Sequence, residues 1–204
     1  DGTEINGCGP DIDAEALEQL MEKIDRLGEG DVLVLAGSIP YSMPDDMYQR
    51  ILERIQGRGV LTVVDATRDL LVKVLPYHPF LVKPNNHELG DIFDVKLSTR
   101  EEVIPYGKKL QEMGAQNVLI SMAGEGAVLI AADGQCLKAP APKGTLVNGV
   151  GAGDSMVAGF LTGWMEEKDY AHAFCMGIAA GSASAFSENL ATREEVMQVL
   201  KQVK

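Results

Sequence analysis

Cysteine is rare in this sequence of 204 residues, and its copies are scattered. The thiols at Cys8, Cys136 and Cys175 are odd in number and form no C-x-x-C pair. Such usage argues against a disulfide framework and favours a reducing compartment, which we expect to be the cytoplasm.

Positive charge is also in short supply: 18 lysines and arginines face 30 aspartates and glutamates, which gives a formal net charge of −12. This balance argues against nucleic acid or an anionic membrane as a partner. The three histidines share no metal-ligand spacing, so a structural zinc site is not expected. No apolar run approaches the length of a membrane span, and the first residues form no signal peptide.

Two familiar phosphate-binding motifs are missing as well. The Walker pattern G-x-x-x-x-G-K-[ST] occurs nowhere. A dinucleotide fold needs G-x-G-x-x-G, but Asp154 stands where the third glycine is required, and its charge would repel a pyrophosphate. A Rossmann oxidoreductase is therefore disfavoured.

A glycine turn of another kind is present at residues 147–160, where Gly149, Gly151 and Gly153 lead into Asp154 and a helix-forming run. Alternate glycines let the backbone approach a ligand closely, and the helix start offers unpaired N–H groups to an anion. The helix macrodipole favours an ionised carboxylate at Asp154. Taken alone, such a cluster is more often a plain tight turn than a binding site. An ionised carboxylate beside a bound phosphate indicates phosphoryl transfer to a hydroxyl.

Short β-branched runs alternate with helical patterns along the chain, which is typical of βαβ units around a mainly parallel sheet. We predict strands over 32–36, 61–65, 80–83, 117–122, 127–131 and 135–139, the last three as a meander. Helices are predicted over 13–27, 44–56, 99–113, 152–166, 170–186 and 193–203, with Pro44 just inside its helix. The length and the 46% hydrophobic content indicate one α/β domain over residues 1–204.

Three further polar clusters end predicted strands. Lys83 ends one strand, and Asn85 and Glu88 follow at a spacing that puts both on one side of a helical turn. They could hold the water shell of Mg²⁺ while Lys83 meets a phosphate, but a helix cap at Asn85 or Asn86 explains the same pattern. The others are the turn 121–127, also compatible with a simple hairpin, and Ser38. Strand ends of this kind share one crevice in an α/β sheet, which predicts one site.

The order of these motifs resembles the PfkB (ribokinase-like) family of carbohydrate kinases, most closely the branch of 1-phosphofructokinases and tagatose-6-phosphate kinases. The resemblance covers essentially the whole chain and implies a three-layer αβα sandwich. It rests on E-I-N-x-x-G-P at 4–10, A-G-S-I-P at 36–40, K-P-N-x-x-E-L at 83–89, S-M-A-G-E-G-A at 121–127 and V-G-A-G-D-S-M at 150–156. The last segment is the most specific.

The resemblance implies ATP and Mg²⁺ as cofactors and a sugar phosphate as acceptor. Asp154 would accept the hydroxyl proton, an anion hole would come from Gly151, Ala152 and Gly153, and Ser38 would contact the acceptor. Glu88 would organise Mg²⁺ through water. Contacts to the nucleotide would come from Lys83, Asn85, Ser121, Ala123, Gly124, Glu125, Gly126, Gly153, Ile178 and Ser182, the residues at 178 and 182 lining the adenine pocket. The implied product is fructose 1,6-bisphosphate, with tagatose-6-phosphate kinase as the alternative.

The sequence departs from the family pattern at three places. Gly149 stands where the family usually has Thr or Ser, which removes a hydroxyl near the phosphates. Ala123 replaces a usual glycine, and Ala66-Thr67-Arg68 replaces a common small Ser-Gly. We interpret these as subfamily variation at the nucleotide loops.

Family members begin with a strand that bears an acceptor-binding aspartate, a Gly-Gly signature and a small β lid, and none of these precedes Asp1. We therefore expect the C-terminal two thirds of the kinase domain, with an uncovered sheet edge that favours a homodimer. Acceptor positioning can account for about 7–11 kcal/mol of barrier reduction, so these residues alone are expected to bind nucleotide with little turnover.

Overall fold

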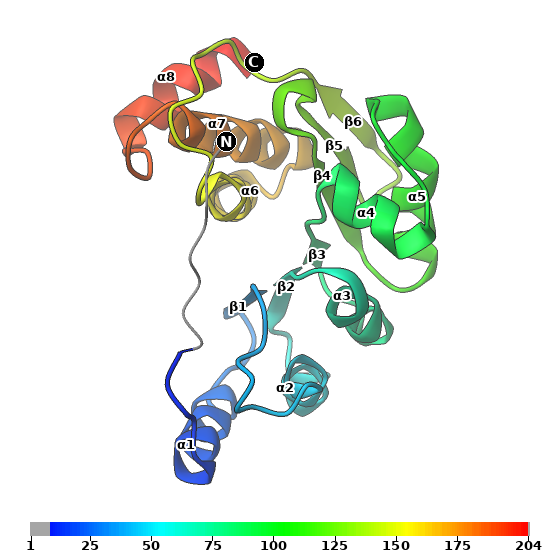
Figure 1. The fold of residues 1–204 in the computed structure, drawn as a ribbon, viewed down its shortest axis with the longest axis vertical. Helices are drawn as coiled ribbons and strands as arrows, with labels where there is room; N and C mark the ends of the chain where they lie inside the picture. The colour runs from blue at the N-terminus through cyan, green and yellow to red at the C-terminus, as the bar shows by residue number, and fades with distance from the viewer. Residues whose placement is uncertain (1–8, 204) are drawn as a thin grey trace.

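The computed structural model describes residues 9–203, which form a six-stranded sheet between two layers of helices (Figure 1). The strand order is β1-β2-β3-β4-β5-β6, so every strand pairs with its neighbour in sequence. The first four are parallel, and β5 and β6 continue as an antiparallel meander, as predicted. The strands are β1 (Val32–Ala36), β2 (Leu61–Asp65), β3 (Leu81–Val82), β4 (Asn117–Ser121), β5 (Ala127–Ile130) and β6 (Cys136–Ala139). The predicted αβα sandwich is confirmed.

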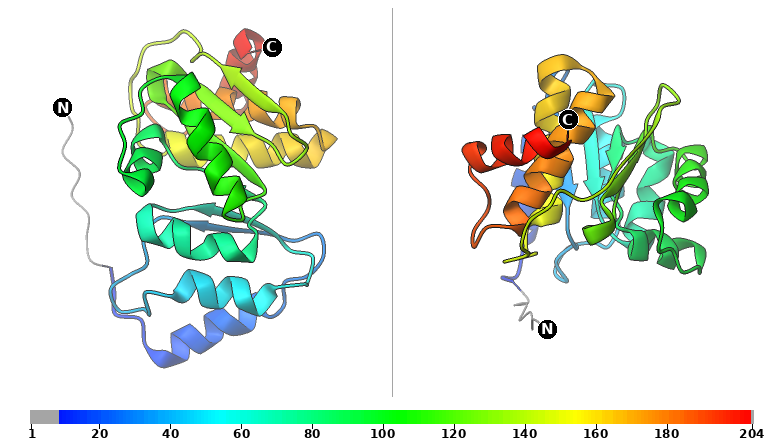
Figure 2. Two further views of the ribbon diagram at one scale, coloured as in Figure 1. Left: turned by 90° about the vertical axis from the view of Figure 1, so that its right-hand side faces the viewer. Right: turned by 90° about the horizontal axis from the view of Figure 1, so that it is seen from above.

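Helices cover the two faces of the sheet unequally (Figures 1 and 2). The first layer contains α1 (Ala14–Ile24), α2 (Met47–Ile55), α3 (Arg68–Val74), α4 (Asn86–Phe93) and α5 (Arg100–Glu112). The second contains α6 (Ala152–Glu167) and α7 (Tyr170–Ala185), with α8 (Arg193–Val203) packed on the outside of α7. Among residues 9–203, no helix is long and apolar enough to cross a lipid bilayer.

The two faces of the sheet bury separate apolar clusters. Val64, Val82 and Ile120 pack under the first helix layer. Because side chains alternate along a strand, Val63, Leu81 and Leu119 face the other way and pack against α6 and α7. All six side chains are fully buried. The parallel strands β2, β3 and β4 are thus buried on both faces, as crossover connections require.

The edge strand β1 is covered on one face only. Leu35 is buried under the first helix layer, whereas Val34 on the opposite face is 41% exposed. Ala36, which shares that face, is also exposed. Within the described residues no strand pairs with the outer side of β1. The uncovered parallel edge expected from the sequence is therefore present.

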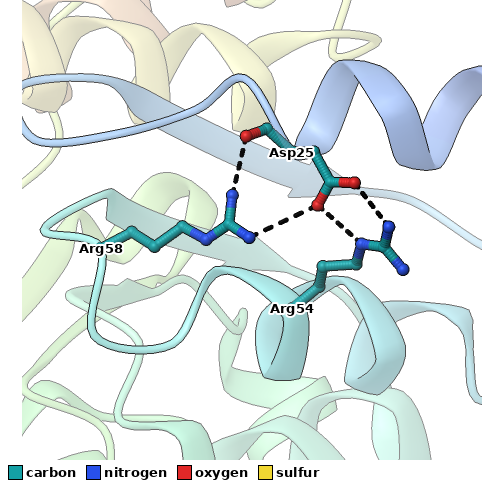
Figure 3. A network of polar contacts seen from close by, with 3 residues as sticks. All are labelled: Asp25, Arg54 and Arg58. Atoms are coloured by element: carbon teal, nitrogen blue, oxygen red, sulfur yellow. Dashed lines mark hydrogen bonds and ion pairs between the residues drawn. The ribbon is translucent and has the colours of Figure 1, made fainter.

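Charged groups fasten the outermost helix, α1, to α2 (Figure 3). Asp25 is the C-cap of α1, and its carboxylate accepts a hydrogen bond of 2.7 Å from Arg54 Nε. Arg58 Nη1 donates to the Asp25 carbonyl over 2.7 Å. The hydrogen bond from Arg54 and the charges of both arginines hold the pKa of the Asp25 carboxyl below its usual value. All three side chains are at least one third exposed, so water screens the attraction.

Three parts of the sequence prediction need correction. Helix α3 was not predicted, because seven residues give too few turns for a periodic signal. Only the first turn of α4 was considered, although it continues to Phe93. Pro44 lies before α2 rather than inside it: its carbonyl accepts from Met47 N at 3.1 Å, and the helix starts at Met47. Residues 4–8 of the E-I-N-x-x-G-P segment lie outside the described residues.

Candidate active site

Three polar side chains share the carboxyl ends of neighbouring parallel strands. Val63, Leu81 and Leu119 face α6 and α7, so the residues two positions later, Asp65, Lys83 and Ser121, emerge on that same face. The backbone pairing continues past the strand ends, because Lys83 N donates to Val64 O at 3.2 Å. An isolated parallel bridge joins Asn85 to Ser121. The sheet therefore brings the predicted 83–89 and 121–127 segments together.

A nearly buried ion pair lies at the centre of this edge. Lys83 Nζ is 3.2 Å from Asp65 Oδ1, and the two side chains are only 6% and 17% exposed. Burial raises the pKa of the Asp65 carboxyl; Lys83 opposes that shift, and the charges of Glu88 and Asp154 add to it. One lysine thus balances three neighbouring carboxylates, so the site has unused capacity for positive charge.

The glycine turn adds a helix start with unpaired N–H groups beside this lysine. Gly151 is the N-cap of α6, with a left-handed φ of 77° and no capping side chain. Ser155 N donates to Gly151 O and Ala152 N to Gly149 O, but within the described residues the N–H groups of Gly153 and Asp154 have no acceptor. A Cβ on Gly153 would lie 3.2 Å from Lys83 Nζ. Two unpaired N–H groups and an ammonium therefore converge beside the exposed Asp154.

Asn85 and Glu88 form a reciprocal capping box at the start of α4. Glu88 N donates to Asn85 Oδ1 and Asn85 N to Glu88 Oε2, both at 2.8 Å. The cap interpretation is thus correct, and it leaves Glu88 Oε1 available. No group of three His, Cys, Asp or Glu within residues 9–203 could hold a metal by itself. A cation at Glu88 would take its other ligands from water and phosphate, which is the pattern that Mg²⁺ favours.

The turn after β4 is a short 3₁₀ segment, Ala123–Glu125, fixed at both ends. Met122 N donates to Gly126 O at 2.9 Å, and Arg100 donates to the Glu125 carbonyl. A Cβ on Gly126 would lie 2.1 Å from Ala139 O, so only glycine fits there. Ala123 has a φ of 47°, and Arg68 has one of 48°. Two of the departures from the family pattern thus place larger residues at left-handed positions that favour glycine.

The remaining predicted residues lie at varying depth. Ser38 is exposed just beyond β1, in a loop tied to the site because Gly37 N donates to Asp65 O at 2.9 Å. Ser182 is half-buried on α7. Ile178 is 1% exposed and packs in the core, so it can support the wall of a pocket only from behind.

The sequence reasoning missed three residues that shape the site. Asp65 is the last residue of β2, and Lys83 directly follows β3. The strand-end pattern that singles out Lys83 could therefore have revealed Asp65 as well. Arg100 secures the turn 123–125 through the Glu125 carbonyl. Tyr48 Oη donates to the Ala36 and Gly37 carbonyls, at 2.9 and 3.2 Å, and holds the end of β1. Burial and the nearby charge of Asp65 raise the pKa of Tyr48.

The family is decided by comparison with known proteins: residues 1–196 match the family model described as pfkB family carbohydrate kinase. The chain belongs to the PfkB family. A 1-phosphofructokinase of Bacillus subtilis is 48% identical over 204 residues, which are all of this chain and 67% of that protein. A D-tagatose-1-phosphate kinase of Bacillus licheniformis is 36% identical over 96% of this chain and 64% of its own length.

A solved structure shows that the similarity extends to the fold. A candidate phosphofructokinase from Staphylococcus aureus superposes with a TM-score of 0.91 at 40% identity. The match covers 99% of this chain and 66% of that one. The chain therefore spans about two thirds of the length of the relatives that it matches.

Proposed function

We propose that this chain forms the nucleotide-binding and phosphoryl-transfer part of a 1-phosphofructokinase. The reaction moves the γ-phosphoryl group of ATP to a hydroxyl of fructose 1-phosphate and yields fructose 1,6-bisphosphate. The proposal rests on the start of α6, where two N–H groups without acceptors lie beside Lys83 and Asp154. The 48% identical Bacillus subtilis relative favours this acceptor.

Asp154 accepts the proton of the attacking hydroxyl in this proposal. It is exposed at the first turn of α6, where the macrodipole favours its ionised form. The backbone of Gly151, Ala152 and Gly153 surrounds the transferring phosphoryl group, and Lys83 neutralises phosphate charge. Because the transition state for phosphoryl transfer is loose, positioning and charge neutralisation carry most of the catalysis.

ATP fits the remaining polar groups. Asn85 and the turn from Ser121 to Gly126 border the nucleotide, with Ser182 on the adenine side. Glu88 would hold Mg²⁺ through water, and the ion would supply charge neutralisation at the phosphates. Ser38 approaches the acceptor from the end of β1, across from the phosphate site. A cytoplasmic location and a homodimer remain predictions, and the second is testable by sedimentation analysis.

The identity of the acceptor is the finer question. Relatives named D-tagatose-1-phosphate kinase share the family fold with this chain, which makes ketohexose 1-phosphates the first acceptors to compare. A coupled assay on the complete natural polypeptide should compare fructose 1-phosphate, tagatose 1-phosphate, tagatose 6-phosphate and fructose 6-phosphate. The highest kcat/KM for fructose 1-phosphate supports the proposal, and preference for a tagatose phosphate replaces it with that activity.

Asp154→Asn tests the proposed base directly. Removing a general base costs about 10²–10⁴-fold in kcat, and the amide keeps the shape of the side chain. Calorimetric titration should find ATP affinity retained. Asp133→Asn is the matched control, because Asp133 lies in the β5–β6 turn at the opposite end of the strands, where its carboxylate accepts hydrogen bonds from Gln135. Full turnover in Asp154→Asn would discard the base assignment.

A second candidate is nucleotide binding without turnover by the 204 residues alone. It is favoured by their coverage of only about two thirds of the relatives' length. Titration of the isolated chain with ATP, followed by the same coupled assay, separates this case from an active kinase.

A further inference from the structure

The segment that follows α7 holds the glycine turn in place. Val147 N and Asn148 N both donate to the Ala185 carbonyl, at 2.9 and 3.2 Å. Asn148 Nδ2 donates to the Glu188 carbonyl at 3.2 Å. Leu190 lies over Gly151, where a Cβ would be 2.7 Å from Leu190 Cδ2. Residues 185–191, far along the chain, therefore hold the outer side of the anion-binding turn.

A buried hydroxyl ties this segment to α6. Ser184 is 3% exposed, and its Oγ accepts a hydrogen bond from Ala191 N at 3.0 Å while donating to Ser155 Oγ at 2.8 Å. Ser155 directly follows Asp154, and its own N–H donates to Gly151 O at 2.9 Å. One hydroxyl thus bridges the loop after α7 and the first turn of α6.

The surroundings leave this bridge little freedom. A Cβ on Gly181 would lie 3.0 Å from Ala152 O, so α7 approaches the start of α6 closely. On the far side of the loop, Thr192 and Glu195 form a reciprocal cap at the start of α8: Thr192 N donates to Glu195 Oε2 at 2.7 Å, and Glu195 N to Thr192 Oγ1 at 3.4 Å. The loop is therefore anchored at both ends.

We propose that Ser184 is a positioning residue for the anion-binding turn, and this inference rests on the proposed kinase function. Its hydroxyl touches neither substrate but fixes where the free N–H groups of Gly153 and Asp154 point. Without it, Ala191 N–H and the Ser155 hydroxyl lose their buried partner, and the turn gains alternative arrangements. Misplacement of catalytic groups by a fraction of an ångström lowers kcat more than it lowers ground-state binding.

Ser184→Ala in the complete natural polypeptide is the test, with Ser187→Ala as the matched control. Ser187 lies on the same loop, but its hydroxyl bonds to Ala183 O and Glu195 and does not contact α6. We expect Ser184→Ala to lower kcat about tenfold with a change in KM for ATP below about twofold, and Ser187→Ala to keep kcat. Double-mutant cycles with Ser155→Ala should be non-additive, because the two hydroxyls share one hydrogen bond.

Hydrogen exchange at the Ser155 amide provides a readout that needs no turnover. We expect exchange to accelerate in Ser184→Ala but not in Ser187→Ala. If Ser184→Ala leaves both kcat and exchange at the Ser155 amide unchanged, the positioning role is wrong. This holds even if the melting temperatures of Ser184→Ala and Ser187→Ala fall by the same amount. If the wild-type protein phosphorylates no sugar phosphate but Ser155 exchange still responds selectively, the kinase proposal fails while the structural bridge stands.

Discussion

Two regions of the sheet are built in contrasting ways, a rigid end around β3–β5 and an open end at the edge strand β1. Around β3–β5, strands are buried on both faces, and α6 and α7 approach closely through glycines such as Gly159 and Gly177. At β1 one face of the strand is largely exposed, and α1 is attached through Ile24, which joins the apolar core of the first helix layer, and through the exposed ion pairs of Asp25. The proposed nucleotide groups lie at the rigid end, and the proposed acceptor contact, Ser38, lies at the open end.

This difference separates two requirements of phosphoryl transfer. Groups that stabilise the transferring phosphoryl must be held in place before the reaction, so they belong on packed elements. The ion pair of Lys83 and Asp65 lies where the rigid part meets the open part, because β2 neighbours β1. Substitutions should therefore cost most at this pair and in the α6–α7 contact, and least at α1.

Lys83→Met should have the largest effect on stability. It leaves the Asp65 carboxylate 17% exposed and without its partner, which we expect to cost up to about 3 kcal/mol at neutral pH. It also removes the cation beside the start of α6, so ATP affinity should fall in the same variant. Urea unfolding and calorimetric titration measure the two effects.

The loss should depend on pH in a defined direction. Burial raises the pKa of Asp65 in the folded protein, and loss of Lys83 raises it further. The folded state then keeps a proton that the unfolded state releases above about pH 3.9, so stability falls as pH rises through this window and returns on acidification. Lys73→Met is the control, because the Lys73 side chain is 44% exposed and its partner Asp45 is exposed as well. A pH-independent loss in Lys83→Met would contradict the ion-pair account.

Gly159→Ala should have the second-largest effect on stability, because it disturbs the packing of α6 against α7 at the rigid end. A Cβ at this position would lie 2.5 Å from Met176 O and 2.6 Å from Ala180 Cβ, so backbone must move. We expect a loss of about 1–3 kcal/mol in urea unfolding, with lower turnover because α6 carries Asp154. Gly57→Ala is the comparison: it meets no atom within 4 Å and carries only the strain of a φ of 76°, about 1 kcal/mol. Equal losses would show that the α6–α7 contact is no tighter than an open turn.

The sequence predicted the strands well because their apolar runs are short and bounded by clear breakers. It also predicted that the polar groups near Lys83 and Ser121 lie together, because polar residues after buried strands emerge at one edge of a parallel sheet, and the structure joins these segments through the bridge between Asn85 and Ser121. The register that sets Asp65 beside Lys83 depends on pairing between segments far apart in the chain. No pattern within either segment predicts that pairing, so the sequence analysis missed Asp65.

Helix α7 illustrates the other limit of sequence reasoning. Almost all of its central residues are buried, between α6 on one side and α8 on the other. Its run of Ala, Gly and Ser therefore has no polar face that would indicate which side of the helix points toward solvent. Ile178 was assigned to a ligand pocket on that run, whereas the side chain lies in the core. Ser184 donates a hydrogen bond to Ser155 Oγ at 2.8 Å although 29 positions separate the two residues along the chain, and it was missed for the same reason.

Asp25→Asn should have the smallest effect and tests the open end. The variant keeps the bond from Arg58 to the Asp25 carbonyl but removes the charge that attracts Arg54. We expect a slight loss of stability at neutral pH that shrinks as salt is added, because the pair is exposed. Arg50→Gln is the control, since Arg50 lies on the same helix α2 and forms its ion pair with Asp46, the N-cap residue of that helix, at 2.7 Å.

The pH dependence of this small effect has the opposite sign to that at Lys83. Because the arginines hold the folded pKa of Asp25 below its unfolded value, the carboxylate stabilises the fold above about pH 3.9 and loses that contribution as pH falls through the folded pKa. The unfolding midpoints of the wild type and Asp25→Asn should therefore converge in acid because the wild type loses stability. The midpoints of the wild type and Lys83→Met should also converge in acid, but because the variant regains stability. If the two midpoints coincide at every pH, the apolar contacts of α1 suffice to hold it, and the open end resembles the rigid one.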